Sequence, residues 1–177
     1  MRSASVPRSP AEREAGEGPD LSETAVFDPA VLSAIGAEAA AAWPSEGCGA
    51  LLGPRPAGGI PRVTLTLPVP NSETGRPRDR FEVAPRDYLA VEDEADRRGL
   101  SLLGFWHSHP EGAARPSATD RAFAWEGLLT VIVAVAARRP EEIGAFEIRG
   151  ADAPFSPVGI LESGNNRLVT RLGPAAP

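Results

Sequence analysis

The chain of 177 residues contains no lysine, only one cysteine and only two histidines. The single cysteine, Cys48, excludes an internal disulfide bond and any zinc module built from several cysteines. Without lysine, the chain cannot be modified on a lysine side chain. It also lacks an apolar run long enough to cross a membrane, and no apolar stretch follows its N-terminal arginines as in a secretory signal. We therefore expect a cytoplasmic protein with no membrane partner.

Positive charge is also in deficit, because 24 acidic residues face 18 basic ones and give a formal net charge of −6. This balance argues against a nucleic-acid partner, which requires a basic patch or stripe. The length and the apolar content of 42% fit one globular domain. We place that domain at residues 23–164, between a disordered N-terminal tail at 1–22 and a loose C-terminal tail at 165–177.

Hydrophobic periodicity divides the domain into helices and strands. Apolar residues at helical spacing, with proline near two of the starts, predict helices over residues 28–44, 85–98 and 117–125. Alternating or continuous apolar runs predict strands at 48–52, 63–69, 81–83, 102–106, 128–135, 145–148 and 158–161. This order predicts an α/β domain with one mixed central β-sheet flanked by helices.

The two histidines, His107 and His109, stand two residues apart at the end of a predicted strand. Residues i and i+2 of a strand point to the same face, so both imidazoles can reach one metal ion. A carboxylate is the natural third ligand of a catalytic zinc site, which keeps one position for water. Asp120 lies eleven residues after His109, one turn into a predicted helix, and the loop between them can fold it back over the histidines.

Peptide hydrolysis at such a metal also requires a base and a donor to the oxyanion. Glu46, just before the predicted strand at 48–52, is the candidate base. Ser117, three residues before Asp120, could donate its hydroxyl to the oxyanion.

Each of these residues also has a simpler interpretation. Ser117 and Asp120 fit a helix capping box, which needs no metal, and Glu46 could be an ordinary solvated carboxylate. Cys48 is expected to be a small apolar residue in a buried strand and not a nucleophile. Asn71 could contact a substrate or simply form a turn, at the start of a polar loop over residues 71–80 that could close over the site.

The spacing of the candidate residues resembles the JAMM (MPN+) family of zinc metalloproteases. The shared pattern is His-x-His, seven residues, Ser, two residues and Asp, with an upstream Glu, and it is complete here in His107, His109, Ser117, Asp120 and Glu46. The similarity extends over residues 27–162 and includes Glu-Gly-Cys-Gly-Ala-Leu-Leu-Gly at 46–53, Pro70-Asn71, the Phe81 segment and Gly104-Phe105-Trp106.

The resemblance implies the JAMM/MPN fold, which is cytidine-deaminase-like, and one Zn²⁺ per chain bound by His107, His109 and Asp120. It implies that Glu46 is the general acid and base and that Ser117 assists the intermediate. It further implies a peptidase or isopeptidase that acts after the C-terminal tail of a ubiquitin-like or β-grasp sulfur-carrier protein. The chain is similar to the compact prokaryotic members, since we find no match to the two insertions of eukaryotic deubiquitinating members.

Two other functions compete with this one. A catalytically inactive MPN-type interaction scaffold is the main alternative, but such members lack one or more of the five residues. A zinc nucleobase deaminase would require a Pro-Cys-x-x-Cys pair, which one cysteine excludes.

Overall fold

The computed structural model describes residues 23–54, 59–150 and 153–172, so the predicted tail at 1–22 lies outside the described residues. The described elements in chain order are β1 (Thr24–Phe27), α1 (Pro29–Ala42), β2 (Cys48–Gly53), β3 (Arg62–Val63), β4 (Leu65–Val69), α2 (Pro85–Arg97), β5 (Ser101–Pro110), α3 (Ala118–Phe123), β6 (Leu129–Ala136), β7 (Arg139–Glu147), β8 (Ser156–Glu162) and β9 (Arg167–Leu168). Within these ranges no helix is long and apolar enough to span a membrane.

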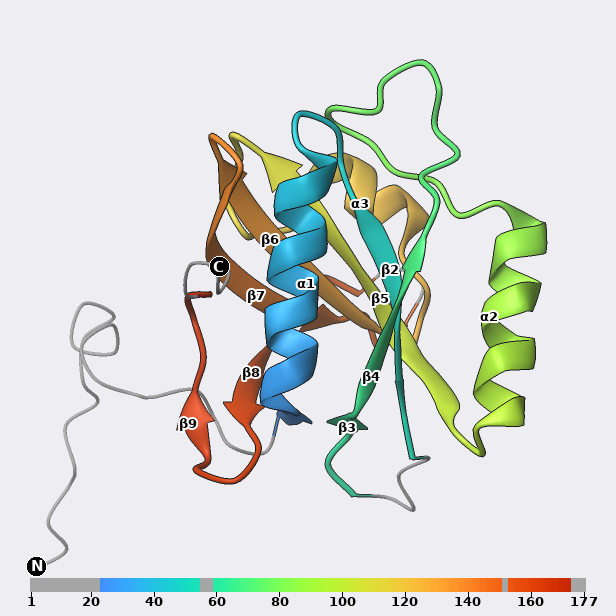
Figure 1. The fold of residues 1–177 in the computed structure, drawn as a ribbon, viewed down its shortest axis with the longest axis vertical. Helices are drawn as coiled ribbons and strands as arrows, with labels where there is room; N and C mark the ends of the chain where they lie inside the picture. Colours follow the sequence, from blue (N-terminus) through green and yellow to red (C-terminus); the bar gives the residue numbers. More distant parts are fainter. Residues whose placement is uncertain (1–22, 55–58, 151–152, 173–177) are drawn as a thin grey trace, which may run out of the picture.

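The described strands form one mixed sheet in the order β3-β1-β8-β7-β6-β5-β2-β4, with β9 paired to β8 (Figure 1). β5 runs parallel to β6, and β1 runs parallel to β8 and β3, whereas the other pairs are antiparallel. The continuous apolar run of β6 lies in the middle of this order, and six of its eight residues are buried. The mixed central sheet predicted from the sequence is confirmed.

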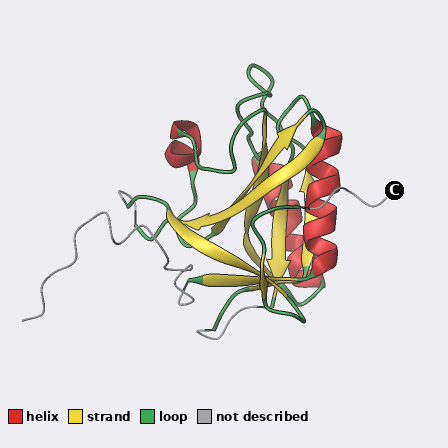
Figure 2. Cartoon of the chain, turned by 90° about the vertical axis from the view of Figure 1, so that its left-hand side faces the viewer, coloured by secondary structure: helices red, strands yellow, loops and turns green. Residues whose placement is uncertain are grey.

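α1 covers one face of the sheet, where the main hydrophobic core lies. Its buried positions Val31, Leu32, Ile35 and Ala39 recur at helical spacing and belong to this core. Figure 2 shows the short α3 on the side of the sheet opposite α1. This leaves a second face, away from α1, on which a site can form.

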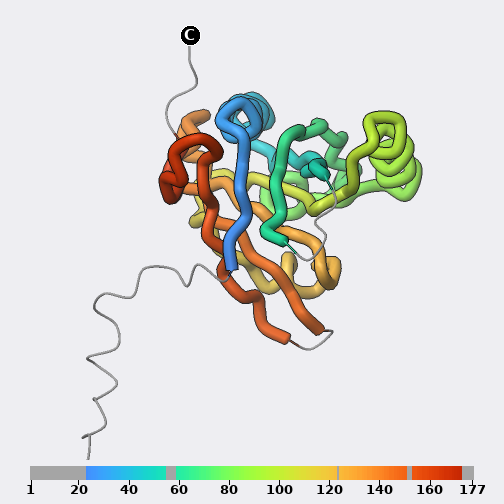
Figure 3. Tube along the Cα trace, turned by 90° about the horizontal axis from the view of Figure 1, so that it is seen from below, coloured from blue at the N-terminus to red at the C-terminus, as the bar shows by residue number. Residues whose placement is uncertain are grey.

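α2 packs beside β5 through a second, smaller core. Val91 and Ala95 of α2 belong to it, together with Phe105 of β5 and buried residues of β2 and β4. Seen from below, α1 and α2 are viewed nearly end-on and lie apart along the curved sheet (Figure 3). Gly99 ends α2 with φ of +65°, a left-handed conformation that glycine adopts without strain, as expected for the residue after a helix.

Several predicted strands differ from those of the structure. The predicted strand at 63–69 is broken at Thr64 into β3, which pairs with β1, and β4, which pairs with β2. The predicted strand at 81–83 is loop, because this segment bonds to an asparagine side chain and not to a neighbouring strand. β1 was not predicted, and its pairing with β8 is a contact between distant parts of the chain.

The prediction of a loose tail from residue 165 is wrong for residues 167–172. β9 pairs with β8, and the Val169 amide donates to the Ile160 carbonyl at 2.8 Å. Val169 is only 4% exposed and Leu172 packs against the main core. β9 has only two residues, which is too short to show a strand periodicity in the sequence. Its hydrogen bonds come from pairing with β8. Residues 173–177 lie outside the described part of the chain.

Shortening Val169 should therefore destabilise the protein. We expect Val169→Ala to lower the free energy of unfolding by about 1–3 kcal/mol, because the valine side chain is buried. The matched control is Leu168→Ala at the adjacent position, which is 41% exposed and should change the free energy by less than about 0.5 kcal/mol. Urea unfolding measures both, and equal effects of the two variants would show that the segment is not packed.

Candidate metal centre

β5 carries both histidines on one face of the sheet. His107 and His109 stand two residues apart on the strand, on the same side as Phe105 of the smaller core. β6 pairs with β5 on one side and β2 on the other, with His107 opposite Cys48 of β2. His107 is only 1% exposed. Pairing on both sides fixes the backbone that presents the two imidazoles.

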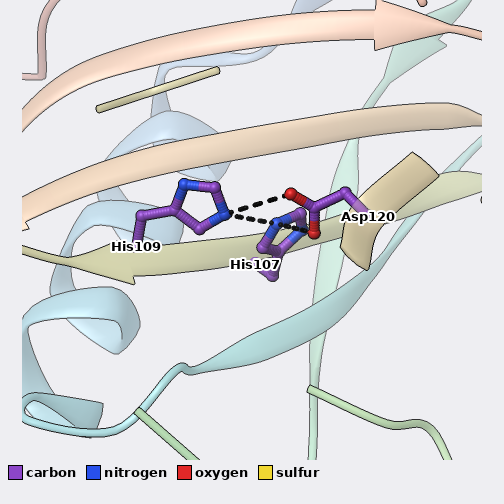
Figure 4. A group of neighbouring side chains, drawn as sticks. All are labelled: His107, His109 and Asp120. Atoms are coloured by element: carbon purple, nitrogen blue, oxygen red, sulfur yellow. Dashed lines mark hydrogen bonds and ion pairs between the residues drawn. The ribbon is translucent and has the colours of Figure 1, made fainter. Parts of the chain in front are cut away.

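The three predicted metal ligands converge on one point, as Figure 4 shows. The Nε2 atom of His107 lies 3.0 Å from Nε2 of His109 and 3.0 Å from Oδ1 of Asp120. Oδ2 of Asp120 lies 3.3 Å from Nε2 of His109. Four bonds of about 2.0–2.1 Å in tetrahedral arrangement separate ligand atoms by about 3.3 Å. The cluster therefore fits one metal ion of that size, with a fourth position left over.

Asp120 reaches the histidines because of how α3 begins. The Ser117 hydroxyl accepts a hydrogen bond from the Asp120 amide at 3.1 Å, and the Ser117 amide donates to Oδ2 of Asp120 at 2.6 Å. These reciprocal bonds form the predicted capping box. The cap and the site are thus the same structure, since the carboxylate that caps the helix also faces both imidazoles.

The electrostatics of His107 and Asp120 suit metal ligands, whereas those of His109 favour its protonated form. Burial lowers the pKa of His107 more than the neighbouring Asp120 raises it. Burial also opposes the charge on His109, but hydrogen bonds to Asp120 and to the Ala113 carbonyl outweigh it and raise that pKa. Burial disfavours the Asp120 carboxylate too, yet the two histidines hold its pKa well below the ordinary value. At neutral pH, an ionised carboxylate thus faces a neutral His107, the protonation states that metal binding requires.

A carbonyl group orients the second imidazole. Nδ1 of His109 lies 2.9 Å from the Ala113 carbonyl oxygen, which can only accept. The hydrogen is therefore on Nδ1, and Nε2 is the nitrogen free to bind a metal. This contact was not predicted, because the sequence gives no signal for a main-chain carbonyl in a loop.

Glu46 is held beside the histidines through its neighbour Gly47. The Gly47 amide donates to the Ser108 hydroxyl and the Gly47 carbonyl accepts from the Ser108 amide, both at 2.9 Å. Ser108 lies between the two histidines on β5, so these bonds extend the β2–β5 pairing and place Glu46 across from His109. Ser108 was not predicted at the site, because its alternation with the histidines points its side chain to the opposite face.

The Glu46 carboxyl is buried, and its pKa suits proton transfer. Its residue is 5% exposed, and its Oε2 has no hydrogen-bond partner within the described ranges. Burial raises the pKa of Glu46 to about 8, against the opposing influence of His109. A carboxyl whose pKa lies near neutrality can both accept and return a proton. Glu46 therefore lies close enough to His109 and Asp120 for their charges to act on its pKa, and Ser117 bonds directly to Asp120.

Two aromatic side chains border the cluster. The ring of Phe81 stacks on His107 with centroids 4.4 Å apart and an interplanar angle of 22°. Phe81 and Trp125 also line a small pocket of about 30 Å³, together with His107 and Asp120. Neither aromatic side chain was predicted at the site, and Phe81 in particular was expected in a strand.

Cys48 and Trp106 both belong to the hydrophobic cores, and for Cys48 this confirms the prediction. Cys48 is 3% exposed and its thiol donates to the Val69 carbonyl, while burial raises its pKa to about 12, so it is not a nucleophile. Trp106 points away from the histidines and is 1% exposed, with its indole N–H bonded to the Thr66 hydroxyl at 2.9 Å.

This chain resembles known proteins, and the family model that matches it spans the site. The model of a family described as prokaryotic homologs of the JAB domain matches residues 28–149. A desampylase of Haloferax volcanii is 37% identical over 103 residues, which are 58% of this chain and 71% of that protein. A probable TtuB-protein conjugate cleaving protease of Thermus thermophilus is 36% identical over 77 residues, 44% of this chain and 47% of that protein. A solution structure from Desulfitobacterium hafniense matches with a TM-score of 0.70 at 28% identity, over 79% of this chain and 93% of that one.

The raised pKa of Glu46 predicts how pH affects the stability of metal-free protein. Between the ordinary value of 4.5 and about 8, the folded state binds more protons at Glu46 than the unfolded state does. The contribution of Glu46 to the free energy of unfolding therefore falls as pH rises through this window, by at most about 1.4 kcal/mol per pH unit. Glu46→Gln removes this dependence, so its stability relative to the wild type should increase from pH 5 to pH 8.

Urea unfolding of both proteins in chelator at several pH values measures this difference. Titrating groups distant from Glu46 contribute equally to both proteins and cancel, whereas the change at His109 and Asp120, which interact with Glu46, is part of the measured difference. A difference that stays constant with pH would show that Glu46 has an ordinary pKa.

Proposed function

This chain belongs to the family of prokaryotic homologues of the JAB domain, and we propose from this membership that it is a zinc-dependent isopeptidase or peptidase. Its substrate is a ubiquitin-like or sulfur-carrier protein, and it hydrolyses the amide bond after the C-terminal tail. The observation that carries the proposal is the buried Glu46 carboxyl on the same face as the cluster of His107, His109 and Asp120.

The relatives support the class of substrate. The Thermus relative is named for cleaving TtuB-protein conjugates, and the Haloferax relative is named a desampylase. Over the aligned region this chain is 36–37% identical to both. The match covers less than half of the Thermus protein, so the leaving group attached to the carrier has to be determined on this chain itself.

Two imidazoles and one carboxylate, with a fourth position left over, are the donor set of a catalytic zinc site. A zinc ion bound by His107, His109 and Asp120 would polarise the scissile carbonyl and make the attacking water more acidic. The Ala113 carbonyl keeps Nε2 of His109 turned toward this position, and the α3 cap holds the carboxylate of Asp120 opposite it.

Glu46 moves the proton. It takes a proton from the attacking water while the water oxygen bonds to the carbonyl carbon of the scissile amide. It then returns that proton to the amide nitrogen as the carbon–nitrogen bond breaks, so the products are a carboxylic acid tail, which loses its proton to solvent, and a free amine. Burial favours this cycle, because it keeps the pKa of Glu46 close to neutrality and excludes competing solvent.

Incubation with carrier fusions tests the activity directly. Candidate ubiquitin-like carriers that end in Gly-Gly are joined to a peptide or to a lysine side chain of a second protein, and the products are weighed with and without chelator. We expect cleavage after the second glycine that stops in chelator and returns with added zinc. Cleavage that persists in chelator, or no cleavage of any such carrier, would count against the proposal.

Replacing the proposed base should abolish most of the activity. We expect Glu46→Gln to lower kcat by about 10²–10⁴-fold, because proton transfer loses its carrier, with zinc content unchanged because Glu46 is not a ligand. Rate measurement and metal analysis on the same sample check both parts. A Glu46→Gln enzyme with normal kcat would contradict the assignment.

Ser117 has a structural role that is separable from its proposed catalytic one. Ser117→Ala should lower the free energy of unfolding by about 1 kcal/mol through loss of the cap. If the hydroxyl also donates to the oxyanion, kcat should fall by about 10²–10³-fold. Thermal unfolding and initial rates distinguish the two, because an unchanged kcat with a lower melting temperature would leave Ser117 as a helix cap alone.

A further inference from the structure

The side chain of Asn71 is fully engaged inside the protein. Its Nδ2 atom donates to the main-chain carbonyls of Glu46 and Arg80, at 3.1 Å each. Its Oδ1 atom accepts from the main-chain amides of Glu73 at 3.0 Å and Glu82 at 3.1 Å. A carboxamide offers two donor hydrogens and two acceptor lone pairs, so all four are used. Of the two hypotheses for Asn71, these bonds support the structural one, in which the side chain serves the fold around it.

These bonds join the proposed base to the segment that follows β4. The Glu46 amide donates to the Pro77 carbonyl at 2.6 Å, so both main-chain polar groups of Glu46 bond to this segment. Asn71 also bonds to the residues on either side of Phe81, the residue whose ring stacks on His107. One side chain thus links the main chain of Glu46 to a contact with a candidate metal ligand.

Glu46 depends on such external support because of its position. β2 begins at Cys48, and the intervening Gly47 has the widest conformational freedom of any residue type. Ser108 fixes Gly47 from the side of β5, whereas Asn71 and Pro77 fix Glu46 itself.

We propose that Asn71 is a positioning residue that holds the Glu46 carboxyl in place for proton transfer. This inference rests on the proposed function, because it takes Glu46 as the base. A shift of about 1 Å in a catalytic group reduces the rate by about 10²-fold, so the bonds to the Glu46 main chain are expected to matter for kcat. They are not expected to matter for KM, since Asn71 has no free polar atom for substrate.

The test is a double-mutant cycle between Asn71 and Glu46. Asn71→Asp keeps the size and the acceptor oxygens but removes both donors, and so releases the Glu46 carbonyl. We expect kcat to fall by about 10²-fold, with KM within about twofold of the wild type and zinc content unchanged. In the Glu46→Gln background, measured with enzyme in excess, the same change should lower kcat by less than about twofold, because the displaced group is already lost.

Ser72→Ala is the matched control. Ser72 lies in the same segment and its hydroxyl donates to the Glu82 carbonyl at 2.9 Å, but it has no bond to Glu46. Its removal should leave kcat within about twofold of the wild type in both backgrounds.

Hydrogen exchange of the Glu46 amide gives a readout that needs neither zinc nor activity. In Asn71→Asp this amide should exchange at least about tenfold faster than in the wild type or in Ser72→Ala. The reason is that the hydrogen bond from Asn71 to the Glu46 carbonyl also keeps the Glu46 amide bonded to the Pro77 carbonyl. Asn71→Ala, which removes all four bonds without adding a charge, replaces Asn71→Asp if that variant does not fold.

The inference is overturned by a wild-type kcat in the folded Asn71 variant, by equal losses in the two backgrounds, or by loss of zinc. Equal losses would mean that Asn71 acts on something other than Glu46. Failure of the proposed function gives a different result, namely a Glu46→Gln enzyme with full kcat. In that case the exchange rate of the Glu46 amide still decides whether Asn71 holds this segment.

Discussion

The pairing of β2 with β5 is the contact on which the site depends. His107 lies opposite Cys48, the first residue of β2, and the two bonds between Gly47 and Ser108 continue this pairing beyond the start of the strand. Residues that face each other across an antiparallel pair point their side chains to the same side. The register therefore brings a carboxyl from one part of the chain to the histidines of another. A shift by one residue would turn the histidines toward the core under α1.

Metal binding and proton transfer require different surroundings for the residues held by the β2–β5 pairing. The three candidate ligands belong to a strand and to the first turn of a helix, and the Asp120 carboxylate faces both imidazoles. Glu46 lies outside any strand and is buried without a full set of hydrogen bonds. Burial of a carboxyl is unfavourable for its ionised form, and this is the property that brings its pKa close to neutrality. The bonds of Asn71 and Pro77 to its main chain, and of Ser108 to the neighbouring Gly47, compensate for the lack of regular structure.

The sequence predicted the features of the site that follow from local periodicity. The spacing of His107 and His109 on a strand, and of Ser117 and Asp120 at a helix start, defines which side chains point together, and both patterns are confirmed. The assignment of Glu46 to the same place required the resemblance to a family, because no local pattern relates residue 46 to residue 109. The loop around Phe81 and the supporting bonds of Asn71 could not be predicted, since they depend on tertiary contacts.

The same distinction holds for the fold. Long apolar runs such as β6 and amphipathic helices such as α2 were predicted because their own residues determine them. β1 and β9 are short and form through pairing with other strands, β1 with β8 and β3, and β9 with β8. Their sequences therefore contain little periodicity, and the last of them was expected to be a loose tail.

The central claim is that His107, His109 and Asp120 hold one zinc ion, and its most direct test is the metal content of the protein. Native mass spectrometry of tag-free protein, purified without chelator and equilibrated with a zinc buffer, should show one zinc per chain. Asp120→Ala and His109→Ala, each folded by circular dichroism, should lose it. A wild-type protein that binds no zinc, or variants that bind as much as the wild type, would contradict this account.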